Sequence, residues 1–255
     1  MTGLAELFAG IAAGEAVTVP ERWRQGRTAF GGLSSALAFH AARAGLAGPP
    51  PLRSAQIAFV GPVTEGARAA PALLRRGRTA AFVACDLTGA DGRALDARFV
   101  FGDARGSTVA ATATPAPAVL PTGYAPRAFP EDAPAFLANF ELADAALPGE
   151  ARPGTMLSWV RVAGGSGLDP VAELILIGDV LPPAAITLAG RRGPLSSMTW
   201  QFDLLTGRPE TEDGWWLLRS EATHAADGFS SQRMAVWDSG GRQVMSGMQM
   251  VALFF

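Results

Sequence analysis

Lysine is absent from this chain: all 21 basic residues are arginine, against 23 acidic residues, for a formal net charge of −2. A nucleic-acid-binding protein usually carries a basic patch or stripe, and none is visible in the sequence. The use of arginine alone, with 30 glycines and 19 prolines, reflects genomic base composition. We therefore expect no nucleic-acid partner.

Cysteine and histidine are also scarce, since the chain holds only Cys85, His40 and His224. One cysteine permits neither an intrachain disulfide nor a thiolate metal cluster, and no His/Cys/Asp group has metal-ligand spacing. We expect no metal and no cofactor, and a buried, structural Cys85. The G-x-S-x-G elbow of a Ser-His-Asp hydrolase is missing as well.

Long apolar runs are missing too. No stretch approaches the ~20 residues of a membrane span, and the first residues, "MTGLAELFAG", lack the basic region of a secretory signal. We therefore expect no membrane span and a cytoplasmic location. With 49% hydrophobic and 17% charged residues in 255, the chain predicts a globular protein of one large domain or two small ones.

What the sequence does contain is an internal repeat. The stretch "PLRSAQIAF" (51–59) matches "PLSSMTWQF" (194–202) at four of nine positions, with an offset of 143 residues. A segment with helical spacing precedes the first copy, "FGGLSSALAFHAARAG", and "GDVLPPAAITLAG" precedes the second. Strand–turn–strand patterns follow both copies, with "GADGR" and "DSGGR" as turns. The order helix, strand, strand, strand is thus expected twice.

This repeat predicts two halves. We expect residues 1–105 and 135–255 each to form a curved antiparallel sheet with one helix packed on it. The sheets would pair face to face or edge to edge, which buries exposed edges. Between the halves, six prolines fall within 115–134, so residues 106–134 are expected to be a linker. The segments "FLANFELAD" and "TMLSWVRVAG" are expected to open the second half as strands.

Four motifs in this order resemble the TesB-like (type II) acyl-CoA thioesterases. The motifs are "FGGLSSALAFHAA", "PLRSAQIAFVGPV", "GDVLPPA" and "SGGRQVMSGMQMVA". The resemblance spans nearly the whole chain and is weakest in the linker. It implies an α+β double hot-dog fold, in which two antiparallel sheets each wrap a helix within one chain.

The resemblance also implies site residues. The family's catalytic aspartate falls on Asp179 and its glutamine on Gln249. Its hydroxyl residue falls on Ser196 or Ser197, between which the motif does not decide. In the family an Asp-His pair follows that hydroxyl, whereas Ser and Met stand in that neighbourhood here. The chain departs from the best-known members at this point, so their substrate range does not simply carry over.

The residues themselves allow a structural interpretation beside each functional one. Asp179 could be the N-cap of a following helix, or a base for water held between burial and a helix dipole. Gln249 shares a strand face with Gly247 and Val251, so it lies either on a solvated face or inward as a partnered amide. Strand serines such as Ser196 and Ser197 are ordinary.

Two glycines follow Phe30 where the first helix is expected to start. Gly31 and Gly32 either allow close helix–sheet packing or present backbone N–H groups to a substrate. We count Phe30, Gly31 and Gly32 as candidate substrate-binding residues. Five of the tryptophans, at 23, 200, 215, 216 and 237, are expected in the core and at interfaces.

The expected function is hydrolysis of an acyl-CoA thioester in lipid metabolism. Asp179, Gln249 and one serine would position a water, and a helix N-terminus would stabilise the oxyanion. Attack by Asp179 itself, through an anhydride, needs the same residues. The first half offers no carboxylate where Asp179 falls in the second, so we expect one site per chain, in a homo-oligomer (dimer or higher).

Three other functions remain open at this stage. They are an acyl-carrier-protein thioesterase, an enoyl-CoA hydratase-like enzyme and a non-catalytic acyl-binding protein. The hydratases of this fold use an Asp/His pair, and no histidine neighbours Asp179 in the sequence.

Overall fold

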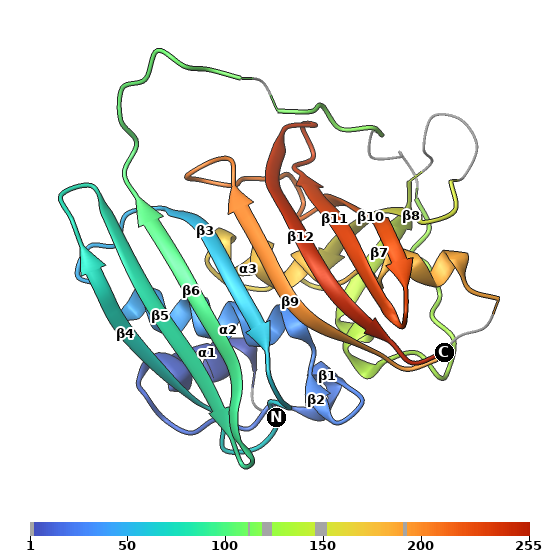
Figure 1. The fold of residues 1–255 in the computed structure, drawn as a ribbon, viewed down its shortest axis with the longest axis horizontal. Helices are drawn as coiled ribbons and strands as arrows, with labels where there is room; N and C mark the ends of the chain where they lie inside the picture. Colours follow the sequence, from blue (N-terminus) through green and yellow to red (C-terminus); the bar gives the residue numbers. More distant parts are fainter. Residues whose placement is uncertain (1–2, 112, 119–123, 146–151, 191–192) are drawn as a thin grey trace.

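The computed structural model describes residues 3–111, 113–118, 124–145, 152–190 and 193–255 (Figure 1). The helices are α1 (Leu4–Ala12), α2 (Gly31–Ala44) and α3 (Pro170–Gly178), with 3-10 turns η1 (Glu21–Trp23), η2 (Ala135–Asn139) and η3 (Ala184–Leu188). The strands of the first half are β1 (Arg24–Gln25), β2 (Thr28–Ala29), β3 (Leu52–Phe59), β4 (Arg68–Arg76), β5 (Ala80–Gly89) and β6 (Gly92–Gly102). Those of the second half are β7 (Phe140–Asp144), β8 (Thr155–Val162), β9 (Leu195–Leu204), β10 (Trp216–Ala226), β11 (Phe229–Trp237) and β12 (Gln243–Leu253).

Ten of the strands form one continuous antiparallel sheet in the order β4-β5-β6-β3-β9-β12-β11-β10-β8-β7. The first half contributes β4-β5-β6-β3 and the second half the rest, and the halves join where β3 pairs with β9 (Figure 1). Of the two expected ways of pairing, the chain therefore uses the edge-to-edge one. The join removes one exposed edge from each half.

The repeat found in the sequence lies at this join. Its two copies are β3 and β9, and Ile57 pairs with Trp200, its own counterpart under the 143-residue offset. Strand order runs outward symmetrically from this pair, with β6, β5 and β4 on one side and β12, β11 and β10 on the other. The structure is thus the α+β double hot-dog that was expected.

Two long strands, β4 in the first half and β10 in the second, were missed by the sequence analysis. Three strands were expected after the first helix, but four form, because β4 also pairs along β5. Nearly every β4 residue is exposed, so the alternation that marks a half-buried strand is absent. Pro71 lies within β4, which an edge strand tolerates because its free side needs no backbone donor.

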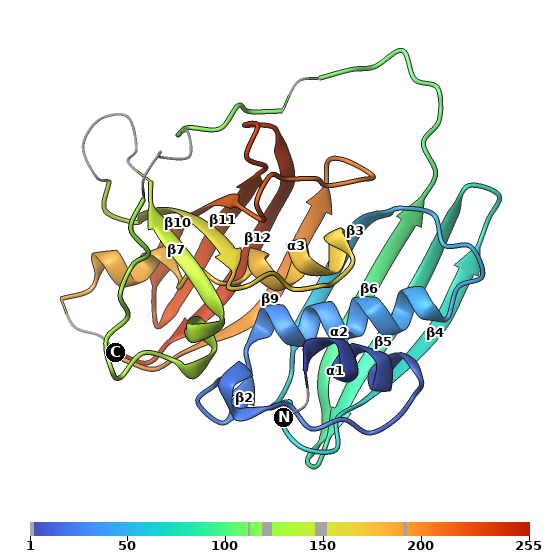
Figure 2. The same cartoon turned by 180° about the vertical axis from the view of Figure 1, so that it is seen from behind.

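The α-helices of the described residues, α1, α2 and α3, all cover one face of the sheet (Figure 2). Ten of the fourteen residues of α2 are buried, which makes it the central helix of the molecule. Its start lies against α3 so closely that a Cβ on Gly32 would fall 2.3 Å from the Leu176 carbonyl oxygen. Only glycine permits this approach, which is the packing role considered for the glycine pair.

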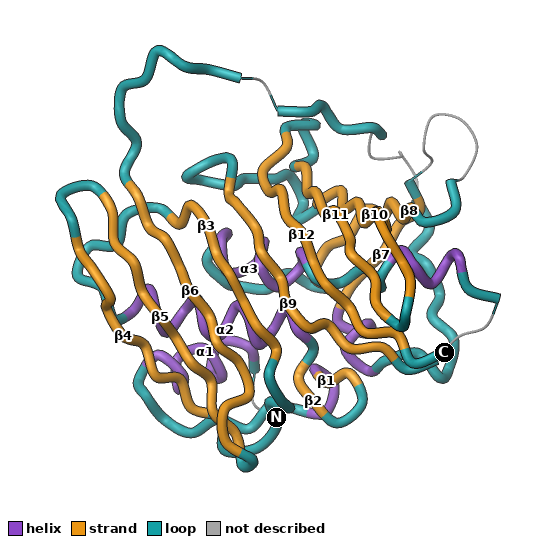
Figure 3. The backbone as a smooth tube through the Cα atoms, viewed as in Figure 1, coloured by secondary structure: helices purple, strands orange, loops and turns teal. Residues whose placement is uncertain are grey.

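The opposite face of the second half carries a separate apolar cluster that includes Trp159, Trp215 and Trp237. Described parts of the 106–134 segment lie over it without helix or strand of their own (Figure 3). The Trp237 indole N–H donates to the Thr114 carbonyl at 2.7 Å, and Tyr124 packs edge-on against Trp215. The segment therefore covers part of the core in addition to joining the halves.

Cys85 is fully buried in β5, and burial raises the pKa of its thiol to about 12. A thiol held in this neutral form packs as a small apolar group, as expected. Among the described residues, no helix has the length and apolar character needed to cross a bilayer.

Candidate active site

Asp179 lies at the end of a helix and not at the start of one. It is the C-cap of α3, and the next turn, η3, begins only at Ala184. The expectation that Asp179 caps a following helix was therefore wrong. The N-cap of α3 is Asp169, whose carboxylate accepts from the Val171 and Ala172 amides. The misleading feature was the apolar run before Asp179, which is α3 itself.

Asp179 nevertheless meets a helix N-terminus, that of α2. The Gly32 backbone N–H hydrogen-bonds its carboxylate, and a Cβ on Gly31 would lie 2.4 Å from Asp179 Oδ2. The first amides of a helix have no intrahelical acceptor, and the helix dipole favours an anion there. Asp179 thus accepts a hydrogen bond from the first turn of α2, a helix that lies far from it in the sequence.

Burial is the largest influence on Asp179 and raises the pKa of its carboxyl from 3.8 to about 7. Hydrogen bonds from the Gln249 side chain and the Gly32 amide stabilise the anion and act in the opposite direction. The residue as a whole keeps some solvent access. A carboxyl with these properties can take up and release a proton near neutral pH.

Gln249 lies on the inner face of β12 and is only 5% exposed. Its Nε2 donates to Asp179 Oδ1 at 2.7 Å and to Ser197 Oγ at 3.1 Å. Of the two orientations considered for Gln249, the structure has the inward, partnered one. Both N–H donors of the amide are directed at residues that the sequence analysis singled out.

A β-bulge brings Ser197 to this face. Met250 pairs with Thr199 but Val251 pairs with Ser197, so Met198 is an extra residue in β9. Strict alternation from the inward Trp200 would turn Ser197 outward, and the bulge reverses this. Ser196 is exposed and lines the neighbouring cavity, but the hydrogen bond to Gln249 is made by Ser197.

A second glutamine, Gln232 on β11, extends the network and was missed by the sequence analysis. Its Nε2 donates to Gln249 Oε1 at 3.0 Å. Its Oε1 accepts from the Ala184 backbone N–H at 2.6 Å and from Ser220 Oγ at 3.0 Å. The only available signal was alternation along β11, which places Gln232 on the same face as Met234 and Val236.

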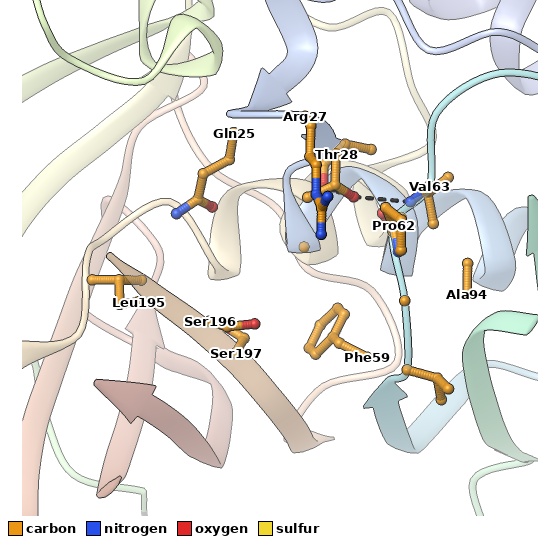
Figure 4. A pocket seen from close by; sticks show the side chains of 15 residues that line it. Gln25, Arg27, Thr28, Phe59, Pro62, Val63, Ala94, Leu195, Ser196 and Ser197 are labelled. Atoms are coloured by element: carbon orange, nitrogen blue, oxygen red, sulfur yellow. Dashed lines mark hydrogen bonds between the residues drawn. The ribbon is translucent and has the colours of Figure 1, made fainter. Parts of the chain in front are cut away.

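A cavity of about 360 Å³ opens beside this network (Figure 4). The start of α2 contributes Gly31 and Ser34 to the lining, and the start of β9 contributes Leu195, Ser196 and Ser197. The remaining walls are the β1–β2 hairpin (25–29), the end of β3 with the segment that follows it (59–63), and Ala94. Gly31 and Ser197 line the cavity while contacting Asp179 and Gln249, so the carboxylate lies directly behind the cavity wall.

The Gly178–Asp179 step is also shaped by Trp200. A Cβ on Gly178 would lie 3.1 Å from the Trp200 ring, tighter than an ordinary contact. This buried tryptophan therefore packs against the end of α3 and limits how far Asp179 can move. The core role expected for Trp200 is observed, and it supports the site from behind.

The other predicted residues lie elsewhere. Phe30 is completely buried as the N-cap of α2, stacked on Phe136, and does not line the cavity. His40 packs edge-on against Phe8, and burial lowers its pKa. His224 is exposed on β10. The site thus combines Asp179 with amides and hydroxyls, not with a histidine.

Comparisons with known proteins agree with this architecture. The sequence profile of the acyl-CoA thioesterase N-terminal domain matches residues 19–102, and that of the acyl-CoA thioesterase C-terminal domain matches residues 115–253. A search of curated proteins finds no match.

Solved structures resemble the whole chain. A conserved protein of unknown function with a hot-dog fold from Alicyclobacillus acidocaldarius has a TM-score of 0.81 at 21% identity, covering 97% of this chain and 98% of its own. The tesB protein of Mycobacterium avium subspecies paratuberculosis has a TM-score of 0.71 at 20% identity, covering 98% and 100%. The acyl-CoA thioesterase II TesB2 of Mycobacterium marinum has a TM-score of 0.69 at 16% identity, covering 93% and 91%. At these identities the likeness shows a shared fold.

Proposed function

The chain belongs to the acyl-CoA thioesterase family and is a thioester hydrolase, and from this premise we propose that it hydrolyses acyl-CoA at the Asp179–Gln249–Ser197 site. The observation that carries the proposal is the Gln249 amide, which donates to both Asp179 and Ser197 beside the cavity. A buried amide with both donors used in this way joins three polar groups that packing alone does not require.

In the proposed reaction, Asp179 is the base. The Gln249 and Gly32 donors hold its carboxylate, and its remaining lone pairs accept an O–H of one water. Ser197 Oγ accepts from Gln249, which leaves its own O–H free to donate to the same water. This water attacks the thioester carbonyl carbon while its proton passes to Asp179.

The following step breaks the C–S bond. The tetrahedral intermediate collapses, the thiolate of coenzyme A leaves, and Asp179 returns the proton to sulfur. With a pKa of about 7, the protonated Asp179 is an adequate acid for a leaving thiolate, since an ordinary thiol such as that of cysteine has a pKa of about 8.5. The developing oxyanion is stabilised by the amide of Gly31, a first-turn donor of α2 in the cavity lining.

Attack by Asp179 itself would give an acyl–aspartyl anhydride instead. A single turnover in ¹⁸O-labelled water tests for an anhydride that water opens at the Asp179 carbonyl carbon. Base catalysis places ¹⁸O in the released acid and leaves Asp179 unlabelled. Label in the Asp179 carboxyl would show that the reaction passes through the anhydride and would rule out the base mechanism.

In the proposed complex, the acyl group packs against the apolar wall of the cavity, which includes Phe59, Val60, Pro62 and Val63 (Figure 4).

The proposed function is tested by measuring release of free thiol from a panel of acyl-CoAs, short through long and aromatic. Asp179→Asn should abolish turnover while the protein remains folded. Asp203→Asn, on the same sheet but exposed, is the matched control and should behave as wild type. If the protein hydrolyses only acyl-carrier-protein thioesters, the substrate is carried by that protein and not by coenzyme A. If it binds acyl thioesters without hydrolysing them, the proposal is overturned.

We also propose that residues 1–105 and 135–255 are the two hot-dog units, linked by 106–134, and that the chain forms a homo-oligomer. The symmetric strand order about β3 and β9 supports the division. Light scattering on the purified protein tests the assembly, and a monomeric mass would contradict it.

A further inference from the structure

We propose that Gln232 is a positioning residue whose side-chain amide orients the Gln249 amide, so that both Gln249 N–H groups face Asp179 and Ser197. The inference rests on the thioesterase function proposed above, and its test includes a measurement that does not depend on turnover.

The Gln249 amide has two orientations that differ only by exchange of Oε1 and Nε2. In one, Nε2 donates to the Asp179 carboxylate and to Ser197, as observed. In the other, Oε1 faces the carboxylate, where two acceptors oppose each other. A protonated Asp179 could donate to that oxygen, so the flipped orientation favours the form of Asp179 that cannot act as a base.

Gln232 selects between these orientations because its own orientation is fixed by the backbone. The Ala184 N–H can only donate, and it points at Gln232 Oε1 at 2.6 Å. Ser220 adds a second donor to the same oxygen at 3.0 Å. Gln232 must therefore turn Nε2 toward Gln249 Oε1, which lies at 3.0 Å. The direction of donation is passed from the backbone to Asp179 through two amides.

The same loop supplies both ends of this network. Ala184 begins η3 five residues after Asp179, and Pro183 is its N-cap. Proline fixes its own φ angle, which helps to hold the Ala184 N–H in place. Gln232 and Ser220 are each 1% exposed, so water does not compete for the amide. A buried network of this kind has one low-energy arrangement.

The first half of the chain shows that packing does not demand these amides. On neighbouring strands of the sheet, Trp200 pairs with Gln249, and Gln249 pairs in turn with Gln232. In the first half, Ile57 is the counterpart of Trp200, and it pairs with Ala97, which pairs in turn with Cys85. The sheet therefore forms with small apolar residues at both places. The glutamines occur only in the half that carries Asp179.

Gln232→Met tests the proposal, because methionine has the length and shape of glutamine without its amide. We expect kcat to fall roughly fivefold to tenfold, the effect of losing one buried hydrogen bond, with KM within twofold of wild type. The acid limb of kcat/KM should move to higher pH as the Gln249 donors are no longer held on Asp179. Gln201→Met, on the exposed outer face of β9, is the matched control and should leave both unchanged.

A double-mutant cycle separates positioning from general packing. In a Gln249→Met background, Gln232→Met should change kcat by less than twofold, because the residue it orients is gone. An equal loss in both backgrounds would show that Gln232 acts on the fold and not through Gln249. If Gln232→Met does not fold, Gln232→Glu keeps the shape and an acceptor for Ala184, and at a pH high enough to ionise the new, buried carboxyl it offers no donor. The same fall in kcat is expected, and activity within twofold of wild type would overturn the proposal.

The titration of Asp179 can also be followed directly by carboxyl ¹³C NMR. Its midpoint should be higher in Gln232→Met than in wild type, whether or not a substrate is turned over. An unchanged midpoint would refute the positioning role. A wild-type protein that releases no thiol from any acyl thioester would instead refute the proposed function, so the two failures are distinguishable.

Discussion

Replacing Asp179 with asparagine is expected to stabilise the folded protein above neutral pH while removing its activity. The carboxyl has a pKa of about 7 in the folded state, because burial opposes its ionisation. In the unfolded chain an aspartate has a pKa of about 3.9. The folded state therefore holds this proton more tightly than the unfolded state. The contribution of Asp179 to stability is full below about pH 4 and is lost as the pH rises through 7.

The magnitude follows from the two pKa values. Integrated from pH 4 to pH 8, the free energy of unfolding of wild type falls by about 4 kcal/mol through this residue alone. Asparagine does not titrate, so the free-energy difference between Asp179→Asn and wild type should grow by that amount over the same range. One cost does not vary with pH: the asparagine NH₂ faces either the Gly32 or the Gln249 donor, which lowers the stability of the variant by about 1–3 kcal/mol.

Urea unfolding of both proteins at several pH values measures this difference, since every other group titrates alike in the two chains. A difference that rises steadily between about pH 4 and pH 7, the two pKa values, and levels off above pH 7 supports the reasoning. A difference that stays flat within about 1 kcal/mol would show that Asp179 is ionised without cost, and the argument from burial would fail.

Four further predictions follow from the same geometry. The acid limb of kcat/KM should fall near pH 7, with about tenfold less activity one unit below it, because ionised Asp179 is the active form; a limb near pH 4 contradicts this. Gly31→Ala places a Cβ 2.4 Å from Asp179 Oδ2 and should lower kcat by about a hundredfold, as a displacement near 1 Å does, whereas Gly45→Ala at the other end of α2 should have no effect in the same assay. Ser197→Ala should lower kcat about tenfold and Ser196→Ala less than twofold, because only the former hydrogen-bonds Gln249, and equal losses would contradict the assignment. Trp237→Phe removes an indole donor beneath the linker and should speed its cleavage in limited proteolysis without changing kcat.

The sequence carried the gross architecture because the repeat is a local pattern. The two copies around Ile57 and Trp200 each form a strand, and the turn residues "GADGR" and "DSGGR" define the hairpins that follow. The resemblance motifs pointed to Asp179 and Gln249, which proved to be in contact. What the motifs could not decide was the choice between Ser196 and Ser197. Alternation in β9 favours Ser196, and a bulge at Met198, invisible in the sequence, turns Ser197 inward.

The structure also changed the position of Asp179 relative to its nearest helix in sequence. One of the two interpretations of Asp179 made it the N-cap of a helix that follows, because an acidic residue before an apolar segment is typical of an N-cap. Helix α3 ends there instead, and the amide that Asp179 accepts belongs to α2, some 150 residues earlier in the chain. Propensity acts within a few residues, so no local pattern could report this contact. Gln232 escaped notice for the same reason, since its partners lie on three other segments.

The sequence by itself determined that this is a two-part α+β chain with a carboxylate and an amide in apolar surroundings. Periodicity, turn chemistry and a repeated motif are all encoded within short stretches. Only the tertiary structure decided which edge joins the halves, which serine faces the site and which helix meets Asp179. These depend on strand register and helix packing, which bring distant residues within hydrogen-bond distance and bury them together. The same burial raises the pKa of Asp179 into the range where it can act as a base.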